Sequence, residues 1–131
     1  MKIRTKTVIS VFTLLILSVS ASAQTKIFFN LDMRKALQDS LFVPPIDKVK
    51  LVGNMKPLNG YQTIYLSDTE PVDSIYTVEI DFPRRDEGKT LSYNFVLQFQ
   101  NRTMEEQGTR NIKITGKEIE LPPIQFGAFA W

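Results

Sequence analysis

The sequence predicts an all-β fold, a single antiparallel β-sandwich, and three observations point to it. About seven short segments alternate apolar and polar residues with a period of two, as strands with one buried face do. Turn residues separate these segments at intervals of about ten residues. No segment has the 3.6-residue period of a long amphipathic helix. This pattern is typical of a β-sandwich, and a closed barrel is the alternative.

The first half of the pattern predicts five strands. In the first, Ile27, Phe29, Leu31 and Met33 alternate with polar residues. Residues 34–41 are expected to form a helical turn or a loop that ends at Pro44-Pro45. Further strands are expected over residues 48–52, 61–66, 74–82 and 91–97, with a loop at 53–60, an acidic turn at 67–73 and a charged turn at 83–88.

The second half is more polar. Residues 100–108 are expected to form a loop, residues 110–115 a strand, and Gly116-Lys117 a turn. Ile119 and Leu121 precede Pro122-Pro123, and residues 124–126 are expected to form a last short strand. The apolar end, residues 127–131, has no expected partner strand. No linker or repeat divides residues 24–131, so we expect one domain there.

The first 23 residues have the three parts of a secretory signal peptide. Lys2, Arg4 and Lys6 form a positive start, residues 8–19 are apolar, and Ala21-Ser22-Ala23 is an A-x-A cleavage site. The apolar run is too short to span about 30 Å of hydrocarbon as a helix. We therefore expect a mature protein that begins at Gln24, has no membrane span, and is periplasmic or extracellular.

Composition excludes several classes of function. The whole chain has a net charge of +2, but its first 23 residues hold three basic residues and no acidic one. The remaining 13 basic and 14 acidic residues leave a net charge of −1, which disfavours nucleic acid as a partner. The absence of His and Cys excludes Ser–His and Cys–His nucleophile pairs, disulfides and thiolate zinc sites. We expect no cofactor and no bound metal.

Five segments together carry a family resemblance: KIFFNLDM, FVPPIDKVKLVGNMKPL, LSDTEPVDSIYTVEIDFP, LSYNFVL and MEEQGTRNIKITG. In this order and spacing they resemble the starch-binding type of carbohydrate-binding module, families 20 and 48 and their bacterial relatives. Those modules read roughly V-x-F-x-V-D-M, V-x-L-V-G-x-F-N-G-W, L-x-D-x-D-x-D-x-Y-T, Y-K-F-V and W-E-x-x-x-N-R. The resemblance implies an immunoglobulin-like β-sandwich that binds a glycan without catalysis.

The family holds sugar on two exposed tryptophans, and neither is kept here. The position of the first tryptophan corresponds to Leu58, or to Tyr61 if the loop is longer. The position of the second tryptophan corresponds to Met104. Asn94 replaces the family's lysine, and Thr109 replaces its asparagine, while the glutamate and the arginine are kept. The resemblance thus implies a carbohydrate site at these positions: Leu58, Asn94, Met104, Glu105, Thr109 and Arg110.

Other residues suggest alternative sites. Four aromatic residues near loops or the C-terminus are candidates for a relocated sugar platform, although ordinary packing also explains them: Tyr61, Tyr65, Phe99 and Trp131. Asp68, Glu70 and Asp73 could hold Ca²⁺, but the regular spacing of a calcium loop is missing, which favours a solvated acidic turn. Asn101-Arg102-Thr103 is an N-glycosylation sequon, meaningful in a eukaryotic secretory host.

The leading expectation is therefore an exported, non-catalytic module that presents a loop surface to an α-glucan or another glycan. The alternative is a protein-interaction module on the same fold, which uses an apolar C-terminal patch around Trp131 to bind an envelope protein. A third hypothesis, a small hydrolase, needs two carboxyl groups facing one cleft. Glu105 and Glu106 are adjacent, and adjacent residues of a strand point to opposite faces. We therefore expect no enzyme.

Overall fold

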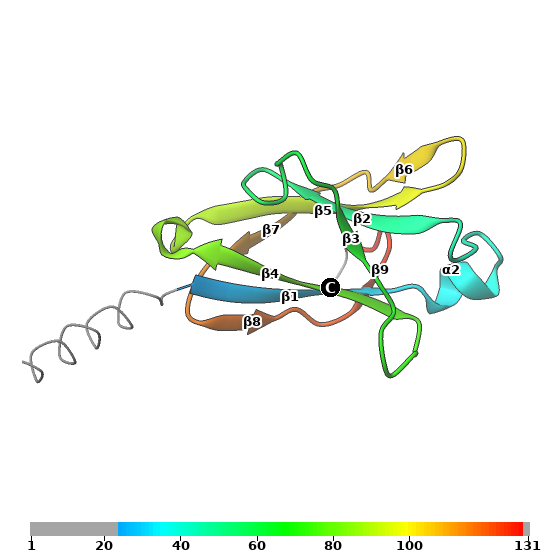
Figure 1. Cartoon of the computed structure of the whole chain (residues 1–131), viewed down its shortest axis with the longest axis horizontal. Helices are drawn as coiled ribbons and strands as arrows, with labels where there is room; N and C mark the ends of the chain where they lie inside the picture. Colours follow the sequence, from blue (N-terminus) through cyan, green and yellow to red (C-terminus); the bar gives the residue numbers. More distant parts are fainter. Residues whose placement is uncertain (1–23, 130–131) are drawn as a thin grey trace, which may run out of the picture.

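The structure is a computed structural model that describes residues 24–129. Two β-sheets pack around a shared hydrophobic core, which confirms the predicted all-β sandwich. The long strands of both sheets run along the length of the molecule (Figure 1). The expected signal peptide, residues 1–23, and Trp131 lie outside the described residues.

The first sheet is built around β1 (Gln24–Asp32). β4 (Ile75–Pro83) pairs with it antiparallel over its whole length. On its other edge β1 pairs in parallel with two short strands, β8 (Glu118–Glu120) and β9 (Ile124–Gln125). These parallel pairs differ from the wholly antiparallel arrangement that the sequence predicts. The chain enters β8 from the opposite sheet rather than through a hairpin with β1, so it is free to run parallel to β1.

The second sheet is built around β5 (Thr90–Gln98) and is entirely antiparallel. β2 (Lys48–Gly53) and then β3 (Ile64–Leu66) lie on one side of β5. β6 (Thr103–Glu105) and β7 (Arg110–Lys113) both pair with its other edge. β6 falls in the stretch expected to be a loop. All three of its residues are exposed, so no apolar alternation marks it as a strand.

In the part of the chain that the structure describes, helical structure is confined to short segments. The helix α2 (Arg34–Gln38) follows β1 directly, where the sequence allowed a helical turn, and the 3₁₀-helix η2 (Arg84–Asp86) occupies the charged turn between β4 and β5. Within residues 24–129, no helix is long and apolar enough to cross a membrane.

The core consists of the inward-facing residues of both sheets. An edge-to-face aromatic contact connects the sheets: Phe29 of β1 lies 5.1 Å from Tyr93 of β5, measured between ring centres. Within β5, Tyr93 makes a second edge-to-face contact with Phe95 at 5.9 Å. The side chains of Ile27, Phe29, Leu31, Phe82 and Leu91 are completely buried. The alternating residues expected to face the core in β1 and β5 do so. The sandwich therefore closes without a disulfide.

Candidate binding pocket at one end of the sandwich

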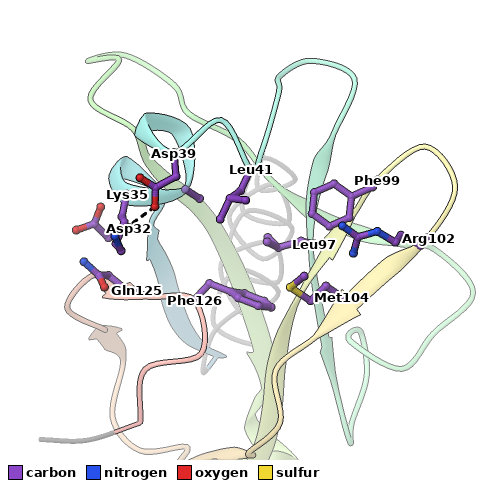
Figure 2. A pocket seen from close by; sticks show the side chains of 11 residues that line it. Asp32, Lys35, Asp39, Leu41, Leu97, Phe99, Arg102, Met104, Gln125 and Phe126 are labelled. Atoms are coloured by element: carbon purple, nitrogen blue, oxygen red, sulfur yellow. Dashed lines mark hydrogen bonds and ion pairs between the residues drawn. The ribbon is translucent and has the colours of Figure 1, made fainter.

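A cavity of about 240 Å³ opens at the end of the sandwich where α2 lies. Three parts of the chain that are distant in sequence form its walls: the end of β1 with α2, the hairpin from β5 to β6, and β9 with the residue after it. Figure 2 shows the lining side chains converging from these segments. The fold thus creates a site that no single sequence motif contains.

Most of the cavity lining is apolar. Leu97 and Met104 are paired across the β5–β6 ladder, so their side chains share the inner face of the sheet. Phe126 approaches from the C-terminal segment, and Leu41 and Phe99 complete the apolar surface (Figure 2). Leu41 is 64% exposed and Met104 is 41% exposed, so both are accessible to a ligand.

Two carboxylates line the side of the cavity next to α2, and each is paired with a cation. Asp32 accepts hydrogen bonds from Nε of Arg34 at 3.0 Å and from Nη2 at 2.7 Å. These bonds lower the pKa of Asp32, so its carboxylate is ionised at neutral pH. Nζ of Lys35 donates to Oδ2 of Asp39 at 3.2 Å. Both carboxylates keep lone pairs that accept hydrogen bonds from hydroxyl groups.

The opposite side of the cavity carries Arg102, in the hairpin between β5 and β6. Its guanidinium carbon lies 4.5 Å from the centre of the Phe99 ring, a cation–π contact. The backbone N–H of Phe99 donates to the carbonyl oxygen of Arg102 at 2.8 Å and closes the hairpin. Within residues 24–129, no carboxylate forms an ion pair with Arg102.

A buried ion pair holds the C-terminal wall of the cavity in place. The Glu106 side chain is completely buried, and its Oε2 accepts hydrogen bonds from Nη2 of Arg110 at 2.5 Å and from the backbone N–H of Gly127 at 2.7 Å. The Phe129 ring covers the guanidinium of Arg110 at 4.4 Å. Because Gly127 follows Phe126 directly, this contact fixes where Phe126 enters the cavity.

The structure separates the six residues at the family positions. Met104 lines the cavity, whereas Leu58 is 6% exposed and Arg110 is 5% exposed. Leu58 packs under Gly53 in the core, and Arg110 is occupied by Glu106. Neither can touch a sugar while these contacts hold, so we correct the expectation that both belong to a surface site.

The remaining three family positions lie elsewhere. Asn94 and Glu105 belong to the outer face of the second sheet, because Glu105 is paired with Val96. The Nδ2 of Asn94 donates to the carbonyl oxygen of Gly108. Thr109 lines a separate, more open hollow of about 440 Å³ between β7 and Pro122-Pro123. Its neighbours there, Arg110 and Asn111, already hold protein partners.

The three aromatic candidates that the structure describes do not form one platform. Phe99 lines the cavity, Tyr61 is fully exposed in the loop between β2 and β3, and Tyr65 lies on β3 beneath Nζ of Lys48 at 5.3 Å. Trp131 is outside the described residues. The sequence thus suggested Phe99 and Met104 as candidates, but not Phe126. Phe126 lies in an apolar C-terminal stretch, and such a stretch alone does not predict a pocket.

The acidic turn is closed by its own hydrogen bonds. Asp68 accepts from the backbone N–H groups of Asp73 at 3.2 Å and Ser74 at 2.8 Å, and Asp73 accepts from Ile75 at 3.0 Å. Among the residues that the structure describes, no group of three acidic side chains is arranged to hold a metal ion. The carboxylates of this turn therefore shape the loop between β3 and β4.

No protein-family model matches the chain, and no curated protein matches it either. A functional interpretation therefore rests on the fold, the cavity and the resemblance in the sequence.

Proposed function

We propose that this protein is an exported, non-catalytic carbohydrate-binding module that takes part of an oligosaccharide into the end cavity. The observation that carries the proposal is the convergence of two aromatic residues, Phe99 and Phe126, with polar side chains in one concave site. Apolar pockets with a few converging polar groups are the usual form of small-molecule sites.

The chemistry of the lining suits a sugar ring. The C–H faces of a pyranose pack on apolar and aromatic surface, which Met104, Phe126 and Leu97 supply. Sugar hydroxyl groups donate hydrogen bonds, and the carboxylates of Asp32 and Asp39 accept them. The volume of about 240 Å³ suits one sugar unit, with the rest of the chain outside.

The same groups favour binding without catalysis. A glycosidase needs one carboxyl group kept protonated near neutral pH as the general acid. The carboxyl group of Asp32 is instead ionised near neutral pH, because Arg34 lowers its pKa. Asp39 forms an ion pair with Lys35. Binding through these two carboxylates requires no protonated acid.

The proposal is tested by retention of the purified protein on insoluble polysaccharides, starch among them, with soluble oligosaccharides such as maltoheptaose as competitors. We expect competed retention, and we expect Met104→Ala and Phe126→Ala to weaken it at least about fivefold, since each removes apolar contact worth about 1 kcal/mol or more. Tyr61→Ala is the matched control, because Tyr61 is fully exposed in another loop. Absence of retention on every polysaccharide, or retention that these cavity variants leave unchanged, contradicts the proposal.

A second candidate function, binding of an envelope protein, is favoured by exposed apolar residues beside the cavity. Leu41, Val43 and Ile46 follow α2 and are 64%, 49% and 55% exposed. Large aliphatic side chains grouped in one exposed segment are typical of protein contact surfaces. A binding partner whose capture is lost in Ile46→Ser, while glycan retention is unaffected, would support this second function.

A further inference from the structure

The charges around the cavity are unevenly compensated. On the side of α2, Asp32 is paired with Arg34 and Asp39 with Lys35, so each carboxylate has a cation beside it. On the opposite side, Arg102 has no carboxylate partner within residues 24–129. The cavity therefore has one cationic group whose charge the described protein does not neutralise.

The contact with Phe99 holds this cation in place. The guanidinium carbon lies 4.5 Å above the ring centre, and Figure 2 shows the side chain reaching from the hairpin across Phe99 toward the cavity. Cation–π contact uses a face of the guanidinium group, whereas its N–H bonds lie in the plane and point outward. Those N–H groups match the two oxygens of a carboxylate.

We infer that the sugar bound in this cavity is acidic, a uronic acid unit whose carboxylate pairs with Arg102. This inference rests on the proposed function, because it assigns the class of glycan to the same site. The apolar surface of Met104 and Phe126 receives the C–H face of the ring, and the hydroxyl groups face the carboxylates of Asp32 and Asp39. The repulsion of an anion by those carboxylates is reduced by their own cations.

The test compares matched pairs of oligosaccharides that differ only at C6. Maltoheptaose is compared with its C6-oxidised form, in which each primary alcohol is a carboxylate, and a cello-oligosaccharide is compared with its oxidised form. Calorimetric titration of the purified exported protein gives each dissociation constant. We expect at least one oxidised form to bind about tenfold more tightly than its neutral partner, as a charge-assisted hydrogen bond allows. We also expect that preference to decline with added salt.

Four variants separate the role of Arg102 from general effects. We expect Arg102→Gln to bring the ratio of the two dissociation constants, neutral over acidic, close to one, and Arg102→Lys to keep part of the preference for the acidic form. Arg85→Gln is the control, because Arg85 is an exposed arginine of η2, in the turn at the opposite end of the sandwich (Figure 1). Met104→Ala should weaken both members of a pair equally.

The outcomes distinguish the two proposals. Equal binding of neutral and acidic forms, or an acidic preference that survives in Arg102→Gln, overturns the acidic-sugar inference and leaves the glycan site standing. If neither the neutral nor the oxidised form of either oligosaccharide binds, the acidic-sugar inference is overturned. That result also contradicts the proposal of a glycan site.

Discussion

Glu106 combines complete burial with four hydrogen bonds. Its two oxygens accept from Nε and Nη2 of Arg110 and from the backbone N–H groups of Phe95 and Gly127. Glu106→Gln leaves the Arg110 guanidinium buried without a countercharge, and removing one partner of such a pair costs about 3–5 kcal/mol. We expect a loss of this size in the free energy of unfolding, measured in urea.

The neighbouring residue gives a matched control. Glu105 is exposed on β6, and Glu105→Gln should change stability by less than about 0.5 kcal/mol. If Glu106→Gln were as mild as this control, the buried pair would contribute little to the stability of the fold.

Asp32 gives a pH-dependent prediction at the edge of the cavity. Hydrogen bonds from Arg34 lower its pKa in the folded protein, so the pairing stabilises the fold above the unfolded-state pKa of about 3.9. That stabilisation is lost as pH falls through the lowered folded-state pKa. Between about pH 5 and pH 6, we expect the wild-type protein to have a higher free energy of unfolding than Asp32→Asn. This difference should shrink below about pH 4.

Urea unfolding at several pH values measures this difference. Glu87→Gln, at an exposed position in the turn before β5, is the control for the loss of a surface carboxylate. A gap between wild type and Asp32→Asn that stays constant down to pH 3 would show that Arg34 does not stabilise the folded state through the Asp32 charge.

At the scale of elements, the C-terminal segment depends on a few side-chain contacts. Phe129 packs over Arg110 and lies 3.0 Å from where a Cβ of Gly108 would be. We expect Phe129→Ala to loosen this segment, because it removes the ring that covers the guanidinium. Hydrogen exchange at the Gly127 N–H should become faster, and binding in the cavity should weaken, because Phe126 loses its fixed position.

The control for this variant is a distant aromatic-to-alanine change. Tyr65→Ala on β3 should leave exchange at Gly127 unchanged. Unaltered exchange in Phe129→Ala would mean that the hydrogen bond to Glu106 alone holds the segment.

The elements also show where sequence patterns are informative. The alternation of Ile27, Phe29 and Leu31 predicted β1 because burial of one face leaves a period of two. β6 carried no such signal, since it is exposed and is held by backbone pairing to β5. The cavity was only partly predictable for a related reason. Met104 and Phe99 were candidates on separate grounds, but Phe126 and Arg102 join them through tertiary structure alone.

At the scale of the whole molecule, cleavage at the expected site would leave the first strand whole. β1 starts at Gln24, and Thr25 is already buried, with its hydroxyl donating to the Gly116 carbonyl oxygen at 2.6 Å. We expect a secretion-competent host to export the protein and to cleave it between Ala23 and Gln24. The net charge of the exported chain then becomes −1 instead of +2.

Intact-mass measurement of the periplasmic or secreted protein tests this directly. The expected mass is that of residues 24–131, and Ala23→Phe should block cleavage or move it, because signal peptidases require a small residue at that position. An exported protein that still begins at Met1 would contradict the cleavage. A chain that stays inside the cell would contradict the export itself, and with it the access to external glycans on which the proposed binding depends.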